Sequence, residues 1–510
     1  MNAIVCALLS ALGFYFSFGL GDQWWLAWLA PVPVLWFAFG HAKGWQVFAA
    51  AFAAAALGGT SLLRAYAGLL PAPILILAIC GPALSFTLSV AGARRVQGAL
   101  GSVAAMFAFA ALWSALDFLA SFNASGGSVA TPAAAEVGAP LFIQTASLVG
   151  FPGITFLLGF VAAGIALASR TRESLPAVLA AVLFAANAAY GYARLSTPPV
   201  GFLRTALIDS DATMGPTARD DRAKVMADID AYVVQIAKLR GAQVRLIVLP
   251  ENIARVAPAI RDEAQAKLAA AAHAVGATVV AGFNTFVDGA QRNVSWAFVP
   301  NTPTPATYMK RRLIPVLESR VYAPGPGPKK LANGIGLEIC KDMDFDRMIR
   351  ADAVATHPVL LAVPAWDFDK DDWSHARVAV LRSVENGVPM ARSARDGLLT
   401  LNDRYGRIVA AARTGDGFRT LLGALPVARP GGFTLYDRIG DAFGWLCMAL
   451  AIGLFGWSFL PARTRASIAR RRRQHRSRGR DASDLGPVNS SSPVRGSTRL
   501  GTPANSGSRK

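Results

Sequence analysis

The sequence predicts a two-part fold, in which a multi-span α-helical membrane domain is followed by an α/β sandwich domain. The first observation is composition, because 53% of the 510 residues are hydrophobic and the mean hydropathy of +0.37 is too high for an ordinary soluble enzyme. The second is the distribution of these residues, since long apolar segments fill the chain up to about residue 195. Beyond that point short apolar strands alternate with amphipathic helices, which indicates sheets covered by helices on their outer faces.

Seven apolar segments make up the predicted membrane domain, residues 1–195. Most of them are long enough to cross a hydrocarbon core at about 1.5 Å of rise per residue. The first segment lacks a basic start and a small-residue cleavage site, so we interpret it as an uncleaved span and not as a signal peptide. The segments run over residues 2–20, 24–40, 45–63, 68–92, 100–121, 140–169 and 175–193.

Basic residues between the segments predict the orientation of this domain. They fall in the loops after the second, fourth and sixth segments, and the positive-inside rule places such loops in the cytoplasm. Seven crossings from a cytoplasmic N-terminus leave residues 196–437 outside the cytoplasm, and a C-terminal transmembrane helix within residues 438–461 returns the chain. The basic loop residues are Lys43, Arg94, Arg95, Arg170 and Arg172.

The last part of the chain, residues 462–510, is a basic tail rich in Arg, Ser and Gly. Its thirteen Lys and Arg residues against two Asp residues supply +11 of the net charge of +19. We expect it to be disordered and cytoplasmic, and to contact anionic lipid as a topogenic anchor. Binding of nucleic acid is the weaker interpretation of this charge.

The predicted extracytoplasmic domain, residues 196–437, alternates strands and helices. Apolar residues recur at three- and four-residue spacing over 225–239, which predicts a helix, and further helices are expected over 259–275 and 373–387. A hairpin is expected to turn at residues 403–406. The predicted strands run over residues 202–210, 244–251, 278–286, 294–300, 306–311, 335–340 and 358–366.

Three residues with catalytic chemistry each stand at the end of one of these strands, namely Glu251, Lys310 and Cys340. Strand ends meet at one edge of an α/β sheet, so the three side chains can meet in space. A carboxylate can deprotonate a thiol, and an ammonium group can lower the thiol pKa and stabilise an oxyanion. Each residue alone has an ordinary structural explanation, but the combination favours nucleophilic catalysis. The other cysteines lie in apolar segments, so no disulfide framework is predicted.

These residues resemble the Glu-Lys-Cys centre of the carbon-nitrogen hydrolase (nitrilase) superfamily. The resemblance spans about residues 200–427 and includes PE at 250–251, KRRLIP at 310–315 and the segment 375–408. Seven spans before such a domain and one after it resemble the apolipoprotein N-acyltransferase branch, as does FTLYDRIGDAFGW at 433–445. The resemblance implies an α-β-β-α sandwich without a cofactor, and the five histidines show no metal-ligand spacing.

The resemblance also implies a two-step acyl transfer. Cys340, deprotonated by Glu251, would take an acyl chain from a phospholipid as a thioester and pass it to the N-terminal amine of a diacylglyceryl-cysteine lipoprotein. Lys310 would hold the oxyanion. In this branch a further glutamate lies eight residues after the lysine, which makes Glu318 a supporting residue. The expected partners are a phospholipid, a lipoprotein and the membrane, without nucleic acid, for a monomeric enzyme of the bacterial inner membrane.

One departure from the branch leaves the acceptor open. The branch has Cys-Tyr-Glu where this chain has Cys340, Lys341 and Asp342, and we expect Lys341 and Asp342 to support the site. Trp366 and Trp373 bracket the segment after the next strand and are expected to line an acyl pocket, or else to pack in the core. Two alternatives remain, namely hydrolysis of a C–N bond by the same trio and a non-catalytic lipid- or lipoprotein-binding role.

Overall fold

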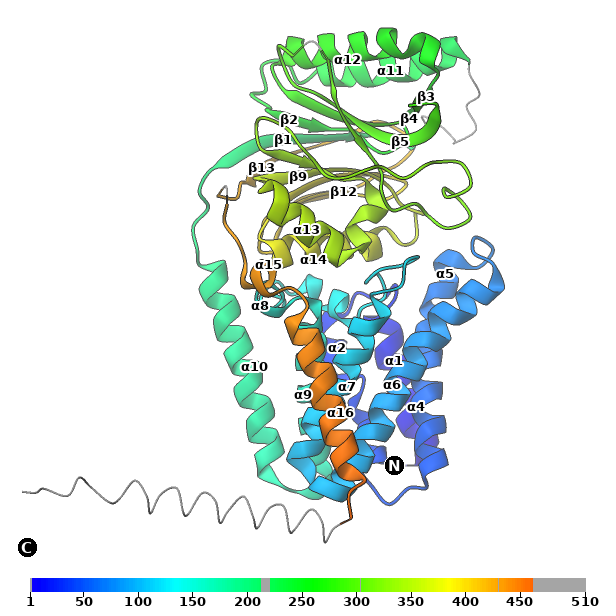
Figure 1. Cartoon of the computed structure of the whole chain (residues 1–510), viewed down its shortest axis with the longest axis vertical. Helices are drawn as coiled ribbons and strands as arrows, with labels where there is room; N and C mark the ends of the chain where they lie inside the picture. The colour runs from blue at the N-terminus through cyan, green and yellow to red at the C-terminus, as the bar shows by residue number, and fades with distance from the viewer. Residues whose placement is uncertain (1, 212–220, 303, 430, 462–510) are drawn as a thin grey trace, which may run out of the picture. The chain divides into compact units, whose positions relative to one another are not determined.

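The membrane domain consists of apolar helices packed side by side, with the C-terminal helix lying among the N-terminal ones (Figure 1). The computed structural model describes residues 2–211, 221–302, 304–429 and 431–461, so the predicted basic tail lies outside the described residues. Residues 1–458 form one compact unit. Its apolar helices are α1 (Ala3–Ser17), α2 (Trp24–Leu29), α3 (Val32–Ala38), α4 (Gly44–Gly59), α5 (Leu63–Tyr66), α6 (Ala72–Leu100), α7 (Ser102–Ala120), α8 (Ala146–Val149), α9 (Phe151–Thr171), α10 (Ser174–Leu195) and α16 (Ala442–Ser458).

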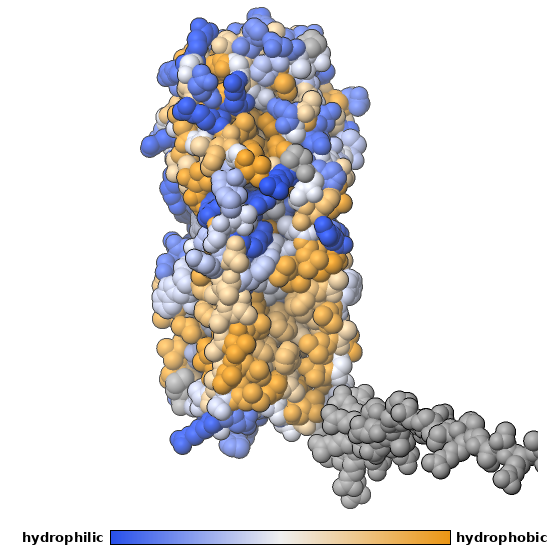
Figure 2. Space-filling view, turned by 90° about the vertical axis from the view of Figure 1, so that its left-hand side faces the viewer, coloured by the Kyte–Doolittle hydropathy of each residue, from blue (hydrophilic) through white to orange (hydrophobic). Residues whose placement is uncertain are grey.

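Five helical stretches among the described residues are long and apolar enough to cross a membrane. Apolar side chains dominate the molecular face over these helices (Figure 2). The multi-span membrane fold is therefore confirmed, whereas the number of eight spans stays a prediction. The long stretches are Gly44–Tyr66, Ala72–Leu100, Ser102–Ala120, Phe151–Thr171 and Ser174–Leu195, and the shorter apolar helices are Ala3–Ser17, Trp24–Ala38 and Ala442–Ser458.

Glycine and proline interrupt two of the predicted apolar segments. The apolar segment over residues 140–169 is divided between two helices, because Gly150 adopts a φ of +73° between α8 and α9 and Pro152 is the second residue of α9. Residues 24–40 divide at Pro31 into the short helices α2 and α3. The loop between α7 and α8, which we call the α7–α8 loop, also contains a 3₁₀ helix, η2 (Pro132–Gly138).

The second part of the unit is a sandwich of two sheets, which confirms the predicted α/β class (Figure 1). The first sheet has the strand order β13-β1-β2-β4-β5-β6, with β3 paired to β4, and the second has the order β12-β11-β10-β9-β8-β7. The strands are β1 (Phe202–Asp209), β2 (Leu246–Val248), β3 (Ala254–Val256), β4 (Thr278–Val287), β5 (Ala290–Phe298), β6 (Ala306–Met309), β7 (Lys329–Lys330), β8 (Ile335–Leu337), β9 (Leu360–Trp366), β10 (Met390–Arg395), β11 (Leu398–Asn402), β12 (Ile408–Arg413) and β13 (Arg419–Pro426).

Helices cover both outer faces of the sandwich. One apolar core lies between the first sheet and the helices α11 (Arg222–Ala237) and α12 (Arg261–Val275), and a second lies between the sheets. The helices α13 (Asp346–Thr356) and α14 (Asp372–Asn386) cover the second sheet, and their apolar residues belong to the same core as the membrane helices. The sandwich is thus packed directly on the membrane domain.

Polar contacts fix this junction. Phe151 donates its backbone N–H to Glu385 Oε1 of α14 at 2.8 Å, at the first residue of α9. Ser128 of the α7–α8 loop donates its backbone N–H to the Asp344 carbonyl at 2.8 Å, four residues after the predicted nucleophile. Thr434 caps the short helix α15 (Leu435–Ile439) and donates its hydroxyl to the Glu385 carbonyl at 2.6 Å. The elements around Cys340 are therefore held from the membrane side.

Candidate active site

The structure brings the three predicted catalytic residues to one end of the sandwich. Glu251 follows β2, and Lys310 follows β6 in the same sheet. Cys340 follows β8 of the facing sheet, so the site lies between the two sheets. Electrostatic coupling of Cys340 to both Glu251 and Lys310 indicates that the three groups are close neighbours.

Lys310 is held by two carboxylates. Its Nζ lies 2.8 Å from Glu251 Oε1 and 2.8 Å from Glu318 Oε1. Asn293 Nδ2 donates to the same two oxygens, at 2.6 Å and 3.0 Å. The Ile314 N–H donates to Glu318 Oε2 at 2.8 Å, which ties Glu318 to its own loop. Glu318, predicted only from its spacing after Lys310, thus lies in direct contact with the lysine.

Burial and pairing set the protonation of this cluster. Lys310 is 1% exposed and Glu251 is 2% exposed. Burial by itself lowers the pKa of Lys310, but the carboxylates of Glu251 and Glu318 outweigh it and hold this pKa well above its usual value. Burial raises the pKa of Glu251, while Lys310 opposes that shift. The lysine is therefore a fixed cation, and Glu251 is a carboxyl group whose proton affinity is increased, as a general base requires.

Cys340 occupies a strained turn and not the end of a strand. It is the first residue of the 3₁₀ helix η4 (Cys340–Asp344) and adopts a φ of +43°, which is unusual for a residue with a side chain. Its Sγ donates to the Trp366 carbonyl at 3.5 Å. Burial, followed by the charge of Glu251, raises the pKa of the thiol well above its usual value. The resting nucleophile is therefore a neutral thiol that needs a base.

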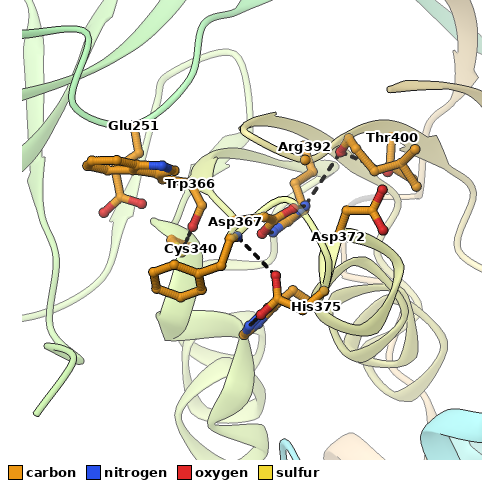
Figure 3. A network of polar contacts seen from close by, with 12 residues as sticks. Glu251, Cys340, Trp366, Asp367, Asp372, His375, Arg392 and Thr400 are labelled. Carbon is orange, nitrogen blue, oxygen red and sulfur yellow. Dashed lines mark hydrogen bonds and ion pairs between the residues drawn. The ribbon is translucent and has the colours of Figure 1, made fainter. Parts of the chain in front are cut away.

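A buried ion pair beside the nucleophile was missed from the sequence. Arg392 of β10 pairs with Asp367 through both guanidinium nitrogens, with Nη1 3.0 Å from Oδ2 (Figure 3). Both residues influence the pKa of Cys340, Arg392 lowering it and Asp367 raising it. The available signal was an arginine in the otherwise buried strand at 390–395, because a buried arginine requires a carboxylate partner.

Asp342 and Lys341 lie beside the nucleophile in different environments. Asp342 is fully buried and accepts four hydrogen bonds, from the Tyr308 hydroxyl at 2.7 Å and from the N–H groups of residues 339, 311 and 312 at 3.2, 3.2 and 2.8 Å. Lys341 Nζ lies 3.2 Å from Asp344 Oδ2 and 5.8 Å from the centre of the Phe345 ring. Asp342 therefore joins the turn of Cys340 to the chain that follows Lys310.

The two tryptophans expected at an acyl pocket occupy different places. Trp366 is next to Cys340 (Figure 3). Its Nε1 donates to Asp396 Oδ2 at 2.6 Å. Trp373, in the first turn of α14, packs against the apolar core shared with the membrane helices. A role for either residue in binding an acyl chain stays a prediction. No group of three His, Cys, Asp or Glu side chains in the described parts of the chain is arranged to hold a metal ion.

Two known domain families match parts of this chain. Residues 10–164 match the apolipoprotein N-acyltransferase N-terminal domain, and residues 212–414 match the carbon-nitrogen hydrolase domain. A curated apolipoprotein N-acyltransferase from Geobacter metallireducens is 24% identical over 506 residues, covering 88% of this chain and 93% of that protein. Another from Allorhizobium ampelinum is 26% identical over 443 residues, covering 78% and 79% of the two chains.

Two solved structures are similar to part of this chain. A CN-hydrolase superfamily protein from Xanthomonas campestris matches with a TM-score of 0.37 and 18% identity, covering 44% of this chain and 90% of that protein. A nitrilase-superfamily member from Saccharomyces cerevisiae matches with a TM-score of 0.37 and 17% identity, covering 45% and 92% of the two chains.

Proposed function

The chain is an N-acyltransferase-type member of the carbon-nitrogen hydrolase superfamily, and from this premise we propose that it N-acylates bacterial lipoproteins at the membrane surface. The observation that carries the proposal is the buried Lys310, paired with Glu251 beside the thiol of Cys340, in a domain packed directly on membrane helices. The acyl donor is a membrane phospholipid, and the acceptor is the free N-terminal amine of a diacylglyceryl-cysteine. Both substrates are anchored in lipid, which suits a site tied to the membrane.

In the first step Glu251 takes the proton of the Cys340 thiol, and the sulfur attacks the ester carbonyl of the phospholipid. The fixed positive charge of Lys310, together with the backbone N–H of Lys341, stabilises the oxyanion. When the tetrahedral intermediate collapses, Glu251 gives its proton to the departing lysophospholipid oxygen. The products are an acyl thioester on Cys340 and a lysophospholipid.

In the second step the lipoprotein amine attacks the thioester carbonyl. Glu251 takes a proton from the amine and returns it to the departing sulfur of Cys340, so the enzyme ends in its starting state. Glu318 keeps Lys310 in place, since both carboxylates contact the same ammonium group. No step of this scheme requires a metal or cofactor.

The proposed orientation follows the distribution of charge. We place the catalytic domain, residues 196–437, in the periplasm and both chain termini in the cytoplasm of an inner-membrane protein. The basic loops and the basic tail then lie on the cytoplasmic side, as the positive-inside rule requires. We propose a monomer that acts without nucleic acid.

Mass spectrometry of lipoprotein N-termini tests the function. A strain depleted of this protein should accumulate diacylated lipoproteins with a free amine, and complementation with the wild-type chain should restore triacylated ones. Cys340→Ser should abolish an acyl-thioester adduct on the intact protein. Unaltered triacylation in the depleted strain contradicts the proposed function, and an adduct that persists in Cys340→Ser identifies a different nucleophile.

A further inference from the structure

The acidic residue at the start of α14 does not cap this helix with its side chain. Asp371 is the N-cap of this helix, where an aspartate ordinarily accepts N–H groups of the first turn, yet its side chain makes no capping bond. Its Oδ1 accepts the Phe368 N–H at 3.0 Å, and its Oδ2 lies 2.9 Å from His375 Nε2 and accepts the Tyr66 hydroxyl. Asp371 is only 1% exposed, so these partners account for its burial.

Tyr66 comes from the membrane domain. It is the last residue of the apolar helical stretch Gly44–Tyr66, and its hydroxyl also lies 3.4 Å from His375 Nε2. Tyr66, Asp371 and His375 thus form one polar cluster across the junction, which we call the Tyr66 cluster. Burial raises the pKa of Asp371, but His375 outweighs it and holds this pKa at about 2. Burial lowers the pKa of His375, but Asp371 raises it to about 9. The pair is therefore ionised at neutral pH.

The same turn of α14 has further contacts with the membrane domain. Ser374 Oγ donates to the Gly19 carbonyl at 3.1 Å, and Arg377 donates to the carbonyls of Gly19 and Gly21. These carbonyls belong to the loop that follows α1. The start of α14 is therefore anchored to two separate membrane segments.

A short loop connects the Tyr66 cluster to the nucleophile. It begins at Trp366, whose carbonyl accepts the Cys340 thiol at 3.5 Å (Figure 3). It ends at Asp371, the N-cap of α14. Backbone hydrogen bonds hold the middle of this loop, from Asp367 N–H to the carbonyl of residue 395 at 2.9 Å and from Asp369 N–H to the carbonyl of residue 396 at 2.7 Å. The loop is thus a short, hydrogen-bonded connection between Asp371 and the carbonyl that accepts the thiol.

We propose that Tyr66 is a positioning residue for the reaction of Cys340, because its hydroxyl bond to Asp371 links the membrane stretch Gly44–Tyr66 to the loop that carries the Trp366 carbonyl. The inference rests on the proposed acyl transfer. It gives the membrane domain a role in the reaction besides anchoring the protein. The position of a membrane helix then determines the orientation of the Cys340 thiol. Tyr66 acts through Asp371 and does not contact the substrate.

The first test uses Tyr66→Phe, which removes one hydroxyl and keeps the ring. Tyr190→Phe is the matched control, because its hydroxyl also links a membrane helix to a neighbour, Ser147 Oγ at 3.0 Å, but not to the β9–α14 loop. Purified protein is mixed with micelles of phosphatidylethanolamine and phosphatidylglycerol, and acyl-thioester formation on Cys340 is followed by intact mass. We expect Tyr66→Phe to be slower by about tenfold at saturating lipid, the effect of losing one hydrogen bond to a charged group, with an unchanged half-saturating concentration. Tyr190→Phe should stay within about twofold of wild type, as for a change away from the site.

A second readout does not depend on the proposed function. The rate at which a small maleimide alkylates Cys340, measured on the Cys340 peptide, reports how the thiol is presented. Tyr66→Phe should raise this rate several-fold, because the thiol loses its fixed carbonyl acceptor, and Tyr190→Phe should not. Asp371→Asn combined with Tyr66→Phe should have no larger effect than the stronger single variant, since both break the same link.

The outcomes distinguish the positioning role of Tyr66 from the proposed acyl transfer. If neither thioester formation nor alkylation distinguishes Tyr66→Phe from Tyr190→Phe, the positioning role is overturned and the acyl transfer stands. If the wild-type protein forms no thioester while alkylation responds to Tyr66→Phe, the positioning role stands and the proposed function fails. Additive effects of the Tyr66 and Asp371 variants on alkylation also overturn the link.

Discussion

At the scale of single residues, Asp342 connects the nucleophile to the catalytic lysine. Its two oxygens accept four hydrogen bonds, two of them from the N–H groups of residues 311 and 312, which directly follow Lys310. A fully buried carboxylate with four donors cannot also face an incoming acceptor. We therefore expect Asp342, which stands where the related branch has a glutamate, to act on the geometry of the site and not on the acceptor.

We expect Asp342→Asn to damage the site, because an amide group offers only one accepting oxygen and leaves buried donors unpaired. The free energy of unfolding should fall by about 1–3 kcal/mol, and the rate of Cys340 thioester formation should fall with it. Lys341→Gln is the control, since the Lys341 ammonium pairs with Asp344 and lies over the Phe345 ring, and takes no part in the four hydrogen bonds to Asp342. Calorimetry and intact mass measure both effects. Equal stability and equal rates of thioester formation in the two variants would show that the hydrogen bonds of Asp342 do not support the site.

Counting protons at Tyr308 yields a second prediction at this scale. The Tyr308 hydroxyl lies 2.7 Å from Asp342 Oδ2 and 2.8 Å from Glu338 Oε2, but it has one hydrogen to donate. Arg311 also donates to the Tyr308 hydroxyl, at 3.1 Å, and to both carboxylate oxygens of Glu338, at 3.3 and 3.2 Å. One hydroxyl hydrogen and one cation thus serve two buried carboxylates, and this shortage of positive charge favours a proton on Glu338. Burial, followed by the charge of Asp342, raises the pKa of Glu338 well above its usual 4.5.

This proton makes stability depend on pH with a defined sign. Between 4.5 and the raised pKa of Glu338, the folded protein holds a proton that the unfolded chain has released, so stability falls as pH rises, by up to about 1.4 kcal/mol per pH unit. Glu338→Gln mimics the protonated group permanently, and its unfolding temperature should fall less between pH 5 and pH 8 than that of wild type. Parallel curves for the two proteins would mean that Glu338 is ionised in the folded state.

At the scale of elements, the α7–α8 loop of the membrane domain contacts the turn that carries Cys340. Gly127 adopts a φ of +54°, and a Cβ there would lie 2.3 Å from the Asp344 carbonyl oxygen at the end of η4. Ser128 donates both its N–H and its hydroxyl to the same carbonyl, at 2.8 Å and 3.1 Å. The loop and the nucleophile turn therefore form one contact surface.

Gly127→Ala should separate these two elements, because an alanine there needs both a left-handed backbone and room that the Asp344 carbonyl occupies. We expect a loss of about 1–3 kcal/mol in stability and slower thioester formation on Cys340. Gly126→Ala is a matched control one residue away, where the nearest atom to a new Cβ is at 3.6 Å. Thermal unfolding and initial acylation rates measure both variants, and identical losses at the two glycines would argue against the contact.

Elements with strong periodicity were predictable from the sequence, and elements defined by partners were not. The expected strands over 278–286 and 202–210 correspond closely to β4 (Thr278–Val287) and β1 (Phe202–Asp209), because β4 is buried over its first eight residues and β1 over its last five. The strand β13 escaped prediction, since its burial alternates and its pairing with β1 is set more than 200 residues away in the sequence. Cys340 was expected to end a strand, but β8 stops at Leu337 and the cysteine enters a strained turn.

The residues of the candidate active site were likewise predictable only where the signal is local in the sequence. Glu251, Lys310 and Cys340 could be found because each follows an apolar run, which is a local signal. The Asp367–Arg392 pair and the Tyr66 cluster join residues on separate elements, 25 and more than 300 positions apart, so only the folded chain reveals them. Pairings of this kind depend on the packing of one layer on another, about which no local pattern carries information.

At the scale of the whole unit, the two ends of the membrane helices differ in chemistry. Arg94 donates to the Ala38 carbonyl at 3.2 Å, and the Arg170 guanidinium stacks 4.5 Å from the Trp36 ring, so the basic loops gather around the end of α3. The opposite end carries Tyr66 and the loop after α1, which contact the catalytic domain. This separation supports a cytoplasmic basic end and a periplasmic catalytic domain.

Labelling of single cysteines tests that orientation. Lys238→Cys places an exposed thiol on the outer face of the catalytic domain, and Glu173→Cys places one at the basic end between α9 and α10. A membrane-impermeant maleimide added to intact spheroplasts should label Lys238→Cys, because that side faces the medium, and should reach Glu173→Cys only after the membrane is permeabilised. The parent chain, whose Cys340 is half-buried and whose other cysteines lie in apolar helices, provides the background. Labelling of Glu173→Cys in intact spheroplasts would mean that the basic end faces the periplasm. The catalytic site would then lie in the cytoplasm, away from periplasmic lipoproteins.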